Sequence, residues 1–317
     1  MDKLFIGPLP PPIGGVANHV LRYSISQNIP VFNEKNKYTY GDFKKLFCLT
    51  KTKIYVHTTS WKILVPLLLK LYLNNKGCKF YFINHNFEIT YSKPLSYKAW
   101  LIFWGLKVFI RKCNVIFVVN RSLIKKMQPI YGNLMYHYYN PFKPPILDSE
   151  LMIINGYGSE IHEFINDRRP LLSSGAWHLS FTNGVDLYGL DLLLELINRL
   201  KINYPEIGLI FGLADSSFNK GYFHKCNEYI VESGIQNNVM FLKEQQELWP
   251  LIKRSHLFIR ATATDGDPLS IQEALFFNTP VLASDCTIRD SKVHLFHSRD
   301  IESLVFNSEN ILIQTIK

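Results

Sequence analysis

The second half of the chain alternates short apolar runs with longer segments whose apolar positions recur about every 3.6 residues. The short runs predict strands at Leu171–Ala176, Ile207–Leu213, Val239–Lys243, His256–Ala261 and Pro280–Ser284. The longer segments predict helices over residues 189–201, 219–234, 246–255 and 268–278. Strands that alternate with helices of this length are typical of βαβ units, and these form parallel sheets.

The first half repeats this alternation less regularly. Strands are predicted within residues 3–9, 53–59, 79–85, 114–120 and 134–140, and helices over 15–27, 61–74, 94–112 and 121–127. Residues 140–150 carry three prolines and no periodicity, which predicts a linker. We therefore expect an α/β protein with two Rossmann-like, doubly wound parallel-sheet domains, residues 1–143 and 144–317. Ligands would bind in an interdomain cleft, at the carboxyl ends of the strands.

Composition and charge fit this division. The 317 residues are 47% hydrophobic and 19% charged, which is ordinary for globular proteins and excludes wholesale disorder. The formal charge of +9 is uneven: residues 1–150 hold 21 Lys and Arg against 6 Asp and Glu, a net +15, and residues 151–317 hold 14 against 20, a net −6. Two domains with different partners explain this split better than a nucleic-acid binder; compositional drift is the alternative.

The cysteines, the start of the chain and the apolar runs predict a cytoplasmic protein. Five scattered cysteines without a CxxC pair suggest reduced thiols. The start of the chain does not resemble a signal peptide. The apolar runs at 61–73 and 99–110 are shorter than the roughly 18 residues of a membrane span, and both contain Lys. No His, Cys and Asp cluster has metal-ligand spacing, so we expect no metal.

The segment RATATDGDPLSIQEALFFNTPVLASD (residues 260–285) carries the most specific chemistry. Asp267 suits a helix N-cap and Pro268 the first helical position. The free amides of that helix start would face the loop containing Gly266, where a backbone without a side chain permits close approach. A helix start of this kind binds phosphate.

Two acids flank this predicted phosphate site. Glu273 would lie about 9 Å along the helix, at about 1.5 Å per residue, and Asp265 on the other side of the helix start. A nucleotide sugar suits this layout because it has hydroxyls on both sides of its phosphates. The alternative is an ordinary capped helix with solvated acids.

The same residues resemble the signature of the retaining nucleotide-sugar glycosyltransferases of family 4, which have the GT-B fold. That signature is two acids separated by seven residues, followed by an alanine and a strand of the Gly-Thr-Pro-Val type. Here it reads Asp265, Glu273, Ala274 and then NTPVLASD. The family usually has Glu at the first position, so Asp265 is a conservative departure.

The N-terminal segment GPLPPPIGGVANHV (residues 7–20) resembles the first strand and glycine-rich loop of the same family. The resemblance implies that the amides of Gly14 and Gly15 approach an anionic donor. The fingerprint GxGxxG is absent, which argues against an NAD enzyme. An Asn-Pro pair in NPF (residues 140–142) also matches, so the resemblance extends over nearly the whole chain, although it is thin between residues 30 and 80.

The chain departs from the family at two basic positions. The second domain usually opens with a Gly-Arg pair and then has a Lys-Gly pair, whose cations neutralise the donor diphosphate. Here Ala176 replaces the Arg and Tyr188 replaces the Lys. Charge-assisted hydrogen bonds are about twice as strong as neutral ones, so their loss would weaken donor binding. Arg260 is the candidate substitute.

Two histidines follow predicted strands of the first half. The family often has a histidine near the transferred sugar at the position of His85, which could bind a hydroxyl or position the acceptor. His57 occupies a similar strand end and is a weaker candidate. A structural role is the alternative for both.

Residues 96–112 predict a basic helix with large aromatic side chains. Trp100 and Trp104 alternate with cations such as Lys107 and Arg111. Such a helix could lie on the anionic inner leaflet of a membrane. The alternative is a core helix whose lysines extend to the solvent.

Together the residues and the resemblance imply a hexosyltransferase. It would move a sugar, with retention of configuration, from a nucleotide sugar to a glycan or a lipid-linked oligosaccharide, in surface-polysaccharide synthesis. The resemblance implies phosphates on the amides of residues 266–270, ribose on Glu273, the sugar near Asp265, and an acceptor facing His85. The amides include those of Leu269 and Ser270.

The alternatives are a GT-B-fold sugar-nucleotide epimerase, and a catalytically weak partner subunit suggested by Ala176 and Tyr188. The sequence does not specify the sugar, the base or the acceptor.

Overall fold

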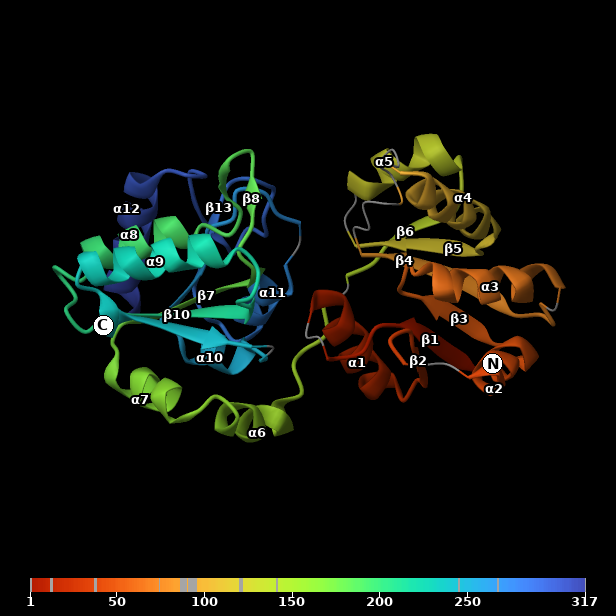
Figure 1. The fold of residues 1–317 in the computed structure, drawn as a ribbon, viewed down its shortest axis with the longest axis horizontal. Coiled ribbons are helices and arrows are strands. Elements are labelled where there is room, and N and C mark those ends of the chain that lie inside the picture. Colours follow the sequence, from red (N-terminus) through yellow and green to blue (C-terminus); the bar gives the residue numbers. More distant parts are fainter. Residues whose placement is uncertain are drawn as a thin grey trace. The chain divides into compact units, whose positions relative to one another are not determined.

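The chain divides into two compact units, Met1–Lys143 and Pro144–Lys317. They are shown in a computed structural model (Figure 1). It describes residues 2–316 apart from 12–13, 37–38, 74, 86–89, 91–95, 120–121, 141, 245 and 267. Each unit is an α/β structure with a parallel sheet of its own.

The described part of the first unit contains a six-stranded parallel sheet with the order β2-β1-β3-β4-β5-β6. Its strands are β1 (Lys3–Gly7), β2 (Val31–Asn33), β3 (Lys53–Val56), β4 (Lys79–Asn84), β5 (Val115–Val118) and β6 (Tyr136–Tyr138). Its helices are α1 (Gly15–Gln27), α2 (Tyr40–Cys48), α3 (Trp61–Leu73), α4 (Tyr97–Lys112) and α5 (Ser122–Tyr131).

The two faces of this sheet are covered unequally. On one face, alternate strand residues such as Ile54 and Phe80 pack against apolar side chains of α3, α4 and α5, which form the main core of the unit. On the other face a smaller cluster of Phe5, Val20 and Ile29 joins β1 to α1. The alternation of strand residues between these two clusters follows from the two-residue period of a strand.

The second unit contains a parallel sheet with the order β11-β10-β7-β12-β13-β14. Its strands are β7 (Leu171–His178), β10 (Gly208–Asp215), β11 (Val239–Lys243), β12 (Leu257–Arg260), β13 (Val281–Ser284) and β14 (His294–Phe296), with a separate hairpin of β8 (Phe181–Thr182) and β9 (Val185–Asp186). Its α-helices are α6 (Glu150–Asn155), α7 (Ser159–Asp167), α8 (Leu190–Leu200), α9 (Lys220–Glu232), α10 (Trp249–Arg254), α11 (Leu269–Phe276) and α12 (Ile301–Thr315). Short 3-10 turns lie at Leu147–Ser149 and Gln236–Asn238.

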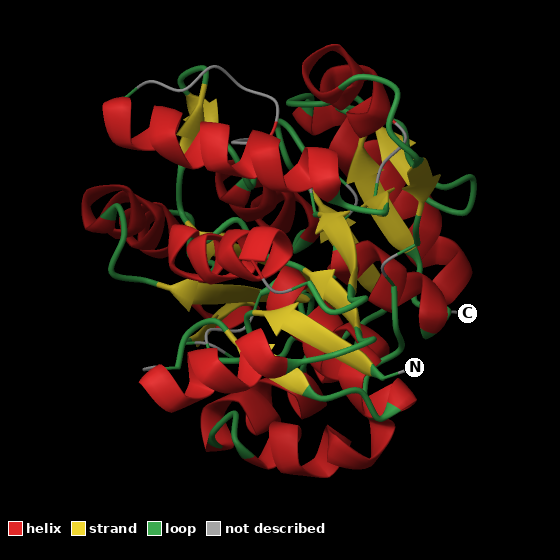
Figure 2. Ribbon diagram, turned by 90° about the vertical axis from the view of Figure 1, so that its right-hand side faces the viewer, coloured by secondary structure: helices red, strands yellow, loops and turns green. Residues whose placement is uncertain are grey.

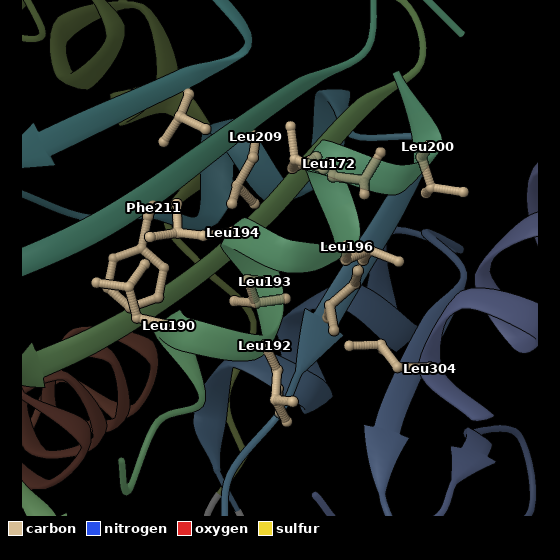
Figure 3. Packing of buried hydrophobic residues seen from close by; sticks show 14 of the residues in the cluster. Leu172, Leu190, Leu192, Leu193, Leu194, Leu196, Leu200, Leu209, Phe211 and Leu304 are labelled. Atoms are coloured by element: carbon tan, nitrogen blue, oxygen red, sulfur yellow. The ribbon is translucent and has the colours of Figure 1, made fainter. Parts of the chain in front are cut away.

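Figure 2 colours the helices and strands of the chain by type. Helices cover both faces of the second sheet, so it is doubly wound (Figure 1). The larger cluster lies under α8, α9 and α12, where Leu190 and Leu194 of α8 lie near the strand residues Phe211 and Leu209 (Figure 3). Complete burial of a leucine stabilises the fold by roughly 1.5–3 kcal/mol. The opposite face packs against α6, α7, α10 and α11.

The predicted class, two parallel-sheet α/β domains, is confirmed, and the differences lie at element ends and in weakly patterned segments. The helix predicted over 121–127 continues to Tyr131, through Pro129. The helix predicted to begin at Pro268 begins one residue later, with Pro268 as its N-cap. The elements that were not predicted have little periodicity or few residues: β2, α2, α6, α7, the β8-β9 hairpin, β14 and α12.

Candidate active site

The signature segment lies where two neighbouring parallel strands end. Residues of β12 pair in register with β13, Phe258 opposite Val281 and Arg260 opposite Ala283. The loop after β12 and the loop after β13 therefore leave the same edge of the sheet. This carboxyl edge is where open α/β sheets bind ligands.

The carboxylate of Asp265 is the centre of a buried polar cluster at this edge. Arg260 donates from Nε to Oδ2 at 3.0 Å and from Nη2 to Oδ1 at 3.3 Å, which is a bidentate pair. The hydroxyl of Thr262 donates to Oδ2 at 3.1 Å, and the amide of Gly266 donates to Oδ1 at 3.0 Å. The Asp265 side chain is only 9% exposed, so these contacts hold it inside the protein.

A second guanidinium, that of Arg289, joins the cluster from the loop after β13. Its Nη2 donates to Oδ2 of Asp265 at 3.1 Å, and its Nη1 approaches the carbonyl oxygen of Gly266 at 3.4 Å. The side chain is 3% exposed. Sequence reasoning missed Arg289, because it lies in a loop that contains no recognisable pattern.

This cluster carries a net positive charge. Burial tends to raise the pKa of Asp265, but the two guanidinium groups outweigh it and hold that pKa below its ordinary value. The carboxylate is therefore ionised at neutral pH. Two guanidinium charges against one carboxylate leave one positive charge at the edge of an otherwise acidic unit.

The start of α11 has fewer free backbone amides for a phosphate than the sequence predicted. Asp267 lies outside the described residues, and Pro268 has no amide hydrogen. The Gly266 amide is already bound to Asp265. Leu269 and Ser270 are the first two residues of the helix, so their amides are the donors that remain of the predicted set. Glu273 lies on the same helix and is buried.

Arg260 lies against both positions where the family cations are replaced. Its Nη1 donates to the carbonyl oxygen of Gly175, next to Ala176, at 3.1 Å. Its guanidinium lies 5.4 Å from the centre of the Tyr188 ring, within the range of a cation–π contact. The predicted substitution of these cations by Arg260 therefore has a geometric basis. The role itself stays a prediction.

Gly189 fixes the backbone beside Tyr188. It has a φ of +71°, and a Cβ there would lie 2.3 Å from the carbonyl oxygen of Ala261, so only glycine fits. Buried Asp186 accepts from the amides of Tyr188 and Leu190 at 2.9 and 2.8 Å, which caps α8. These contacts join the start of α8 to the segment after β12.

The glycine-rich loop of the first unit precedes α1 as expected. Gly14 is the N-cap and Gly15 the first helical residue, and a Cβ at either would meet no atom of the described residues within 4 Å. These glycines therefore leave open space above the helix start. Of the Asn-Pro pair at 140–141, the proline lies outside the described residues.

His85 lies at the carboxyl end of β4, with two other histidines beside it. Nε2 of His85 is 3.0 Å from Nδ1 of His57, which follows β3. His19 of α1 packs against both rings, at centroid distances of 5.0 and 5.4 Å. Burial, and then the neighbouring imidazoles, hold the pKa values of His57 and His85 well below the ordinary value, so both rings are neutral at pH 7.

The helix predicted over 94–112 is described from Tyr97, and its aromatic residues divide between two faces. Phe109 is completely buried in the core, whereas Trp100 and Trp104 are 45% and 51% exposed. Tyr97 stacks on Trp100 and is also exposed. The helix thus has one buried face, and contact of its exposed face with a membrane stays a prediction. Among the described helices, none combines the length and the apolar character needed to cross a membrane.

Part of the second unit is similar to known glycosyltransferases. Residues 179–294 match the family Glycosyl transferases group 1. An uncharacterized glycosyltransferase of Methanocaldococcus jannaschii is 29% identical over 123 residues, 39% of this chain and 26% of that protein. The match therefore spans about a quarter of that relative's length. Residues 179–294, which lie within the second unit, are thus similar to group 1 glycosyl transferases.

Solved structures extend the similarity of fold to the whole chain. Anabaena Alr3699/HepE in complex with UDP has a TM-score of 0.66 at 16% identity, covering 100% of this chain and 91% of that one. An α,α-trehalose-phosphate synthase (UDP-forming) from Burkholderia xenovorans has a TM-score of 0.65 at 10% identity, with 98% and 92% covered. A glycosyltransferase from Rickettsia africae has a TM-score of 0.62 at 12% identity, with 99% and 91% covered. The predicted GT-B fold is confirmed.

Proposed function

We propose that this chain is a glycosyltransferase that takes its sugar from a nucleoside diphosphate donor. The observation that carries the proposal is the Arg260–Asp265–Arg289 cluster, a net cation at the carboxyl edge of the domain that matches group 1 glycosyltransferases. The similarity in fold to Alr3699/HepE, whose structures hold UDP and UDP-glucose, supports this donor class.

In the proposed reaction the second unit stabilises the departing nucleoside diphosphate. Negative charge grows on the leaving phosphate as the bond to the sugar breaks, and fixed positive groups lower the energy of that state. Arg260 would supply the positive charge nearest to the leaving phosphate. The amides of Leu269 and Ser270, at the start of α11, would donate hydrogen bonds to it. Arg289 is more deeply buried and would act through Asp265 by holding the cluster together. Glu273 would bind the ribose and Asp265 would border the sugar.

The first unit would bind the acceptor, and retention of configuration would follow the family. His85, neutral at pH 7, could accept a hydrogen bond from a sugar hydroxyl near the open space above Gly14 and Gly15. The proposed acceptor is a glycan or lipid-linked oligosaccharide, and surface-polysaccharide synthesis is the proposed setting. No metal is required in this scheme.

A membrane surface is the proposed location of that acceptor. The exposed aromatic residues of α4 stand beside α3, whose Trp61, Leu69 and Tyr72 are also about half exposed. Exposed cations, Lys62 and Arg111 among them, belong to the same two helices. Aromatic side chains with cations suit the boundary of an anionic bilayer.

Donor binding tests the proposal most directly. The purified chain is heated with each of a panel of UDP- and GDP-sugars, and the matching donor should raise the thermal midpoint. Arg260→Gln should weaken that donor's binding about 10- to 100-fold, since a hydrogen bond to a charged group contributes roughly 1.5–3 kcal/mol. Arg199→Gln, which removes a surface guanidinium of the same unit, is the matched control and should bind normally.

Product analysis separates the alternatives. A glycosyltransferase releases nucleoside diphosphate and transfers sugar to an added acceptor. An epimerase would convert the donor into a different nucleotide sugar without any acceptor. A partner subunit would bind donor and leave it unchanged. If the chain binds no nucleotide sugar and turns none over, the proposed function is wrong.

A further inference from the structure

Three histidines of the first unit meet at the carboxyl edge of its sheet. His19 lies on α1, His57 directly follows β3, and His85 directly follows β4. Strands β1, β3 and β4 are parallel neighbours, and α1 follows β1. The topology therefore gathers side chains that are far apart in the sequence, which is why their spacing predicted no metal site.

The nitrogens of this histidine cluster (His19, His57 and His85) have the spacing of metal ligands. Each ring offers one nitrogen, and the three nitrogens lie within 4.8 Å of one another. The His57 and His85 nitrogens are 3.0 Å apart. Nitrogens that bind one tetrahedral Zn²⁺ at about 2.0–2.1 Å stand roughly 3.3 Å from each other. Small rotations of the rings would bring the cluster to that geometry.

The burial of the cluster also suits a coordinated metal. A metal binds the lone pair of an imidazole nitrogen, and the side chains of His19 and His57 lie buried inside the unit. His57 is 2% exposed, and its Nδ1 is the ring nitrogen that faces His85. Its other ring nitrogen, Nε2, is buried and has no hydrogen-bond partner among the described residues, so Nδ1 is free to act as the ligand atom.

We propose that His19, His57 and His85 form a binding site for one divalent transition-metal ion, of which Zn²⁺ is the representative. Imidazole ligands favour Zn²⁺, Ni²⁺ and Cu²⁺, whereas Mg²⁺ and Ca²⁺ take oxygen ligands. Three protein ligands leave a fourth position for water or another oxygen ligand. The proposal departs from the expectation of no metal, and it does not depend on the proposed transferase activity.

Neighbouring residues shape the site. The hydroxyl of Tyr139 is 3.4 Å from Nε2 of His19, where it can fix the orientation of that ring. A cavity of about 160 Å³ lies beside His57 and is also lined by Tyr23, Tyr139 and Lys3. A Cβ on Gly7 would lie 2.9 Å from Cβ of His57, so glycine makes room for this histidine.

Metal titration of the full chain tests the site. Protein stripped with a chelator and dialysed is titrated with Co²⁺, and we expect one equivalent to bind with the visible absorption of a tetrahedral cobalt site. One equivalent of Zn²⁺ should abolish that absorption and raise the thermal midpoint. His19→Ala, His57→Ala and His85→Ala should each weaken binding by more than about 100-fold, since even outer-shell changes cost 10- to 100-fold.

His137→Ala is the matched control, because His137 is an exposed histidine of the same unit, on β6. It should leave Co²⁺ binding and absorption unchanged. Circular dichroism checks the fold of every variant. If His57→Ala does not fold, Co²⁺ binding by His85→Gln tests the site instead. The His85 ring is only half-buried, so its replacement should disturb the fold less. Gly7→Ala keeps all three ligands and should still weaken binding by displacing His57.

Two outcomes would overturn the site. One is a folded wild-type chain that shows no saturable cobalt absorption. The other is Co²⁺ binding of equal stoichiometry in the wild type, the three cluster variants and His137→Ala, which indicates scattered surface histidines. Neither outcome bears on donor binding by the second unit, so a failure here is distinguishable from a failure of the proposed function.

Discussion

The Asp265 carboxylate binds two guanidinium groups inside the second unit and holds both of them in place. A buried ion pair contributes little net stability, but removing one partner leaves the others uncompensated at a cost of about 3–5 kcal/mol. Asp265 therefore supports the fold as well as bordering the proposed donor. Its two arginines owe their fixed positions to it.

Acid should remove the contribution of this carboxylate. The folded-state pKa of Asp265 lies below the ordinary value of 3.8, because two arginines favour the charged form. Its stabilising contribution is therefore complete above that ordinary value and is lost as the pH falls through the lower, folded-state pKa. Urea unfolding at a series of pH values measures the difference between wild type and Asp265→Asn.

That difference should be large at pH 7 and shrink below about pH 4, near the ordinary pKa of Asp. Asp167→Asn at the surface end of α7 is the control and should change little at either pH. A difference that does not depend on pH would contradict the assignment of this charge.

Gly189 should not tolerate any side chain. Alanine at a φ of +71° costs about 1–2 kcal/mol, and its Cβ would also collide with the Ala261 carbonyl. Gly189→Ala should lower the free energy of unfolding by more than about 2 kcal/mol for these two reasons. Gly14→Ala, with an extended backbone and open space around it, should change it by less than about 0.5 kcal/mol. Chemical denaturation of both variants makes the comparison.

At the scale of the element, the sequence predicts strands and helices where periodicity is strong. Strand β11 and helix α1 have the predicted ends, because apolar spacing and flanking turn residues coincide there. The start of α11 is displaced because an N-cap depends on backbone geometry at Pro268, which the residue types alone do not determine. Helix α12 was missed because Ser308 interrupts the buried stripe of Leu304, Ile311 and Leu312, and because apolar Phe306 and Ile313 lie on the exposed face.

The candidate site was predictable only where its residues are close in the sequence. Asp265, Glu273 and Arg260 lie within one motif and were found. Arg289 and His19 enter through tertiary contacts, from a loop after β13 and from α1, and nothing local distinguishes them. Contacts between such distant residues depend on the order of the strands in the sheet, which the sequence alone does not reveal.

The exposed aromatic face of α4 should contribute to membrane binding. Trp100→Ser together with Trp104→Ser should reduce sedimentation with anionic phosphatidylserine vesicles at least several-fold, because tryptophan favours the bilayer boundary. Phe306→Ser removes an exposed aromatic side chain of α12 in the second unit and should leave vesicle binding unchanged. Equal binding by all three proteins would exclude α4 as the contact.

At the scale of the whole molecule, each unit has a core of its own. The buried clusters of the first unit contain no residue of the second, and the reverse also holds among the described residues. The charge also divides between the two halves, +15 in the first 150 residues and −6 in the rest. The proposed acceptor surface and the proposed donor site thus belong to units that each have their own core.

The second unit should therefore fold by itself. A fragment of residues 144–317 should unfold in one cooperative transition, since its sheet is covered by its own helices on both faces. The donor that stabilises the full chain should stabilise this fragment too. Calorimetry with and without donor measures both properties, and a fragment without a cooperative transition would contradict the independence of the two cores.

The carboxylate of Asp265 has one more consequence, which concerns exchange of the proposed donor. To Arg260, this carboxylate is a tethered anion that is always present, so the proposed diphosphate would compete with it for the same guanidinium. Such competition would limit the affinity for the donor and speed the release of the spent nucleotide. Removing the carboxylate would then tighten nucleotide binding and slow its release.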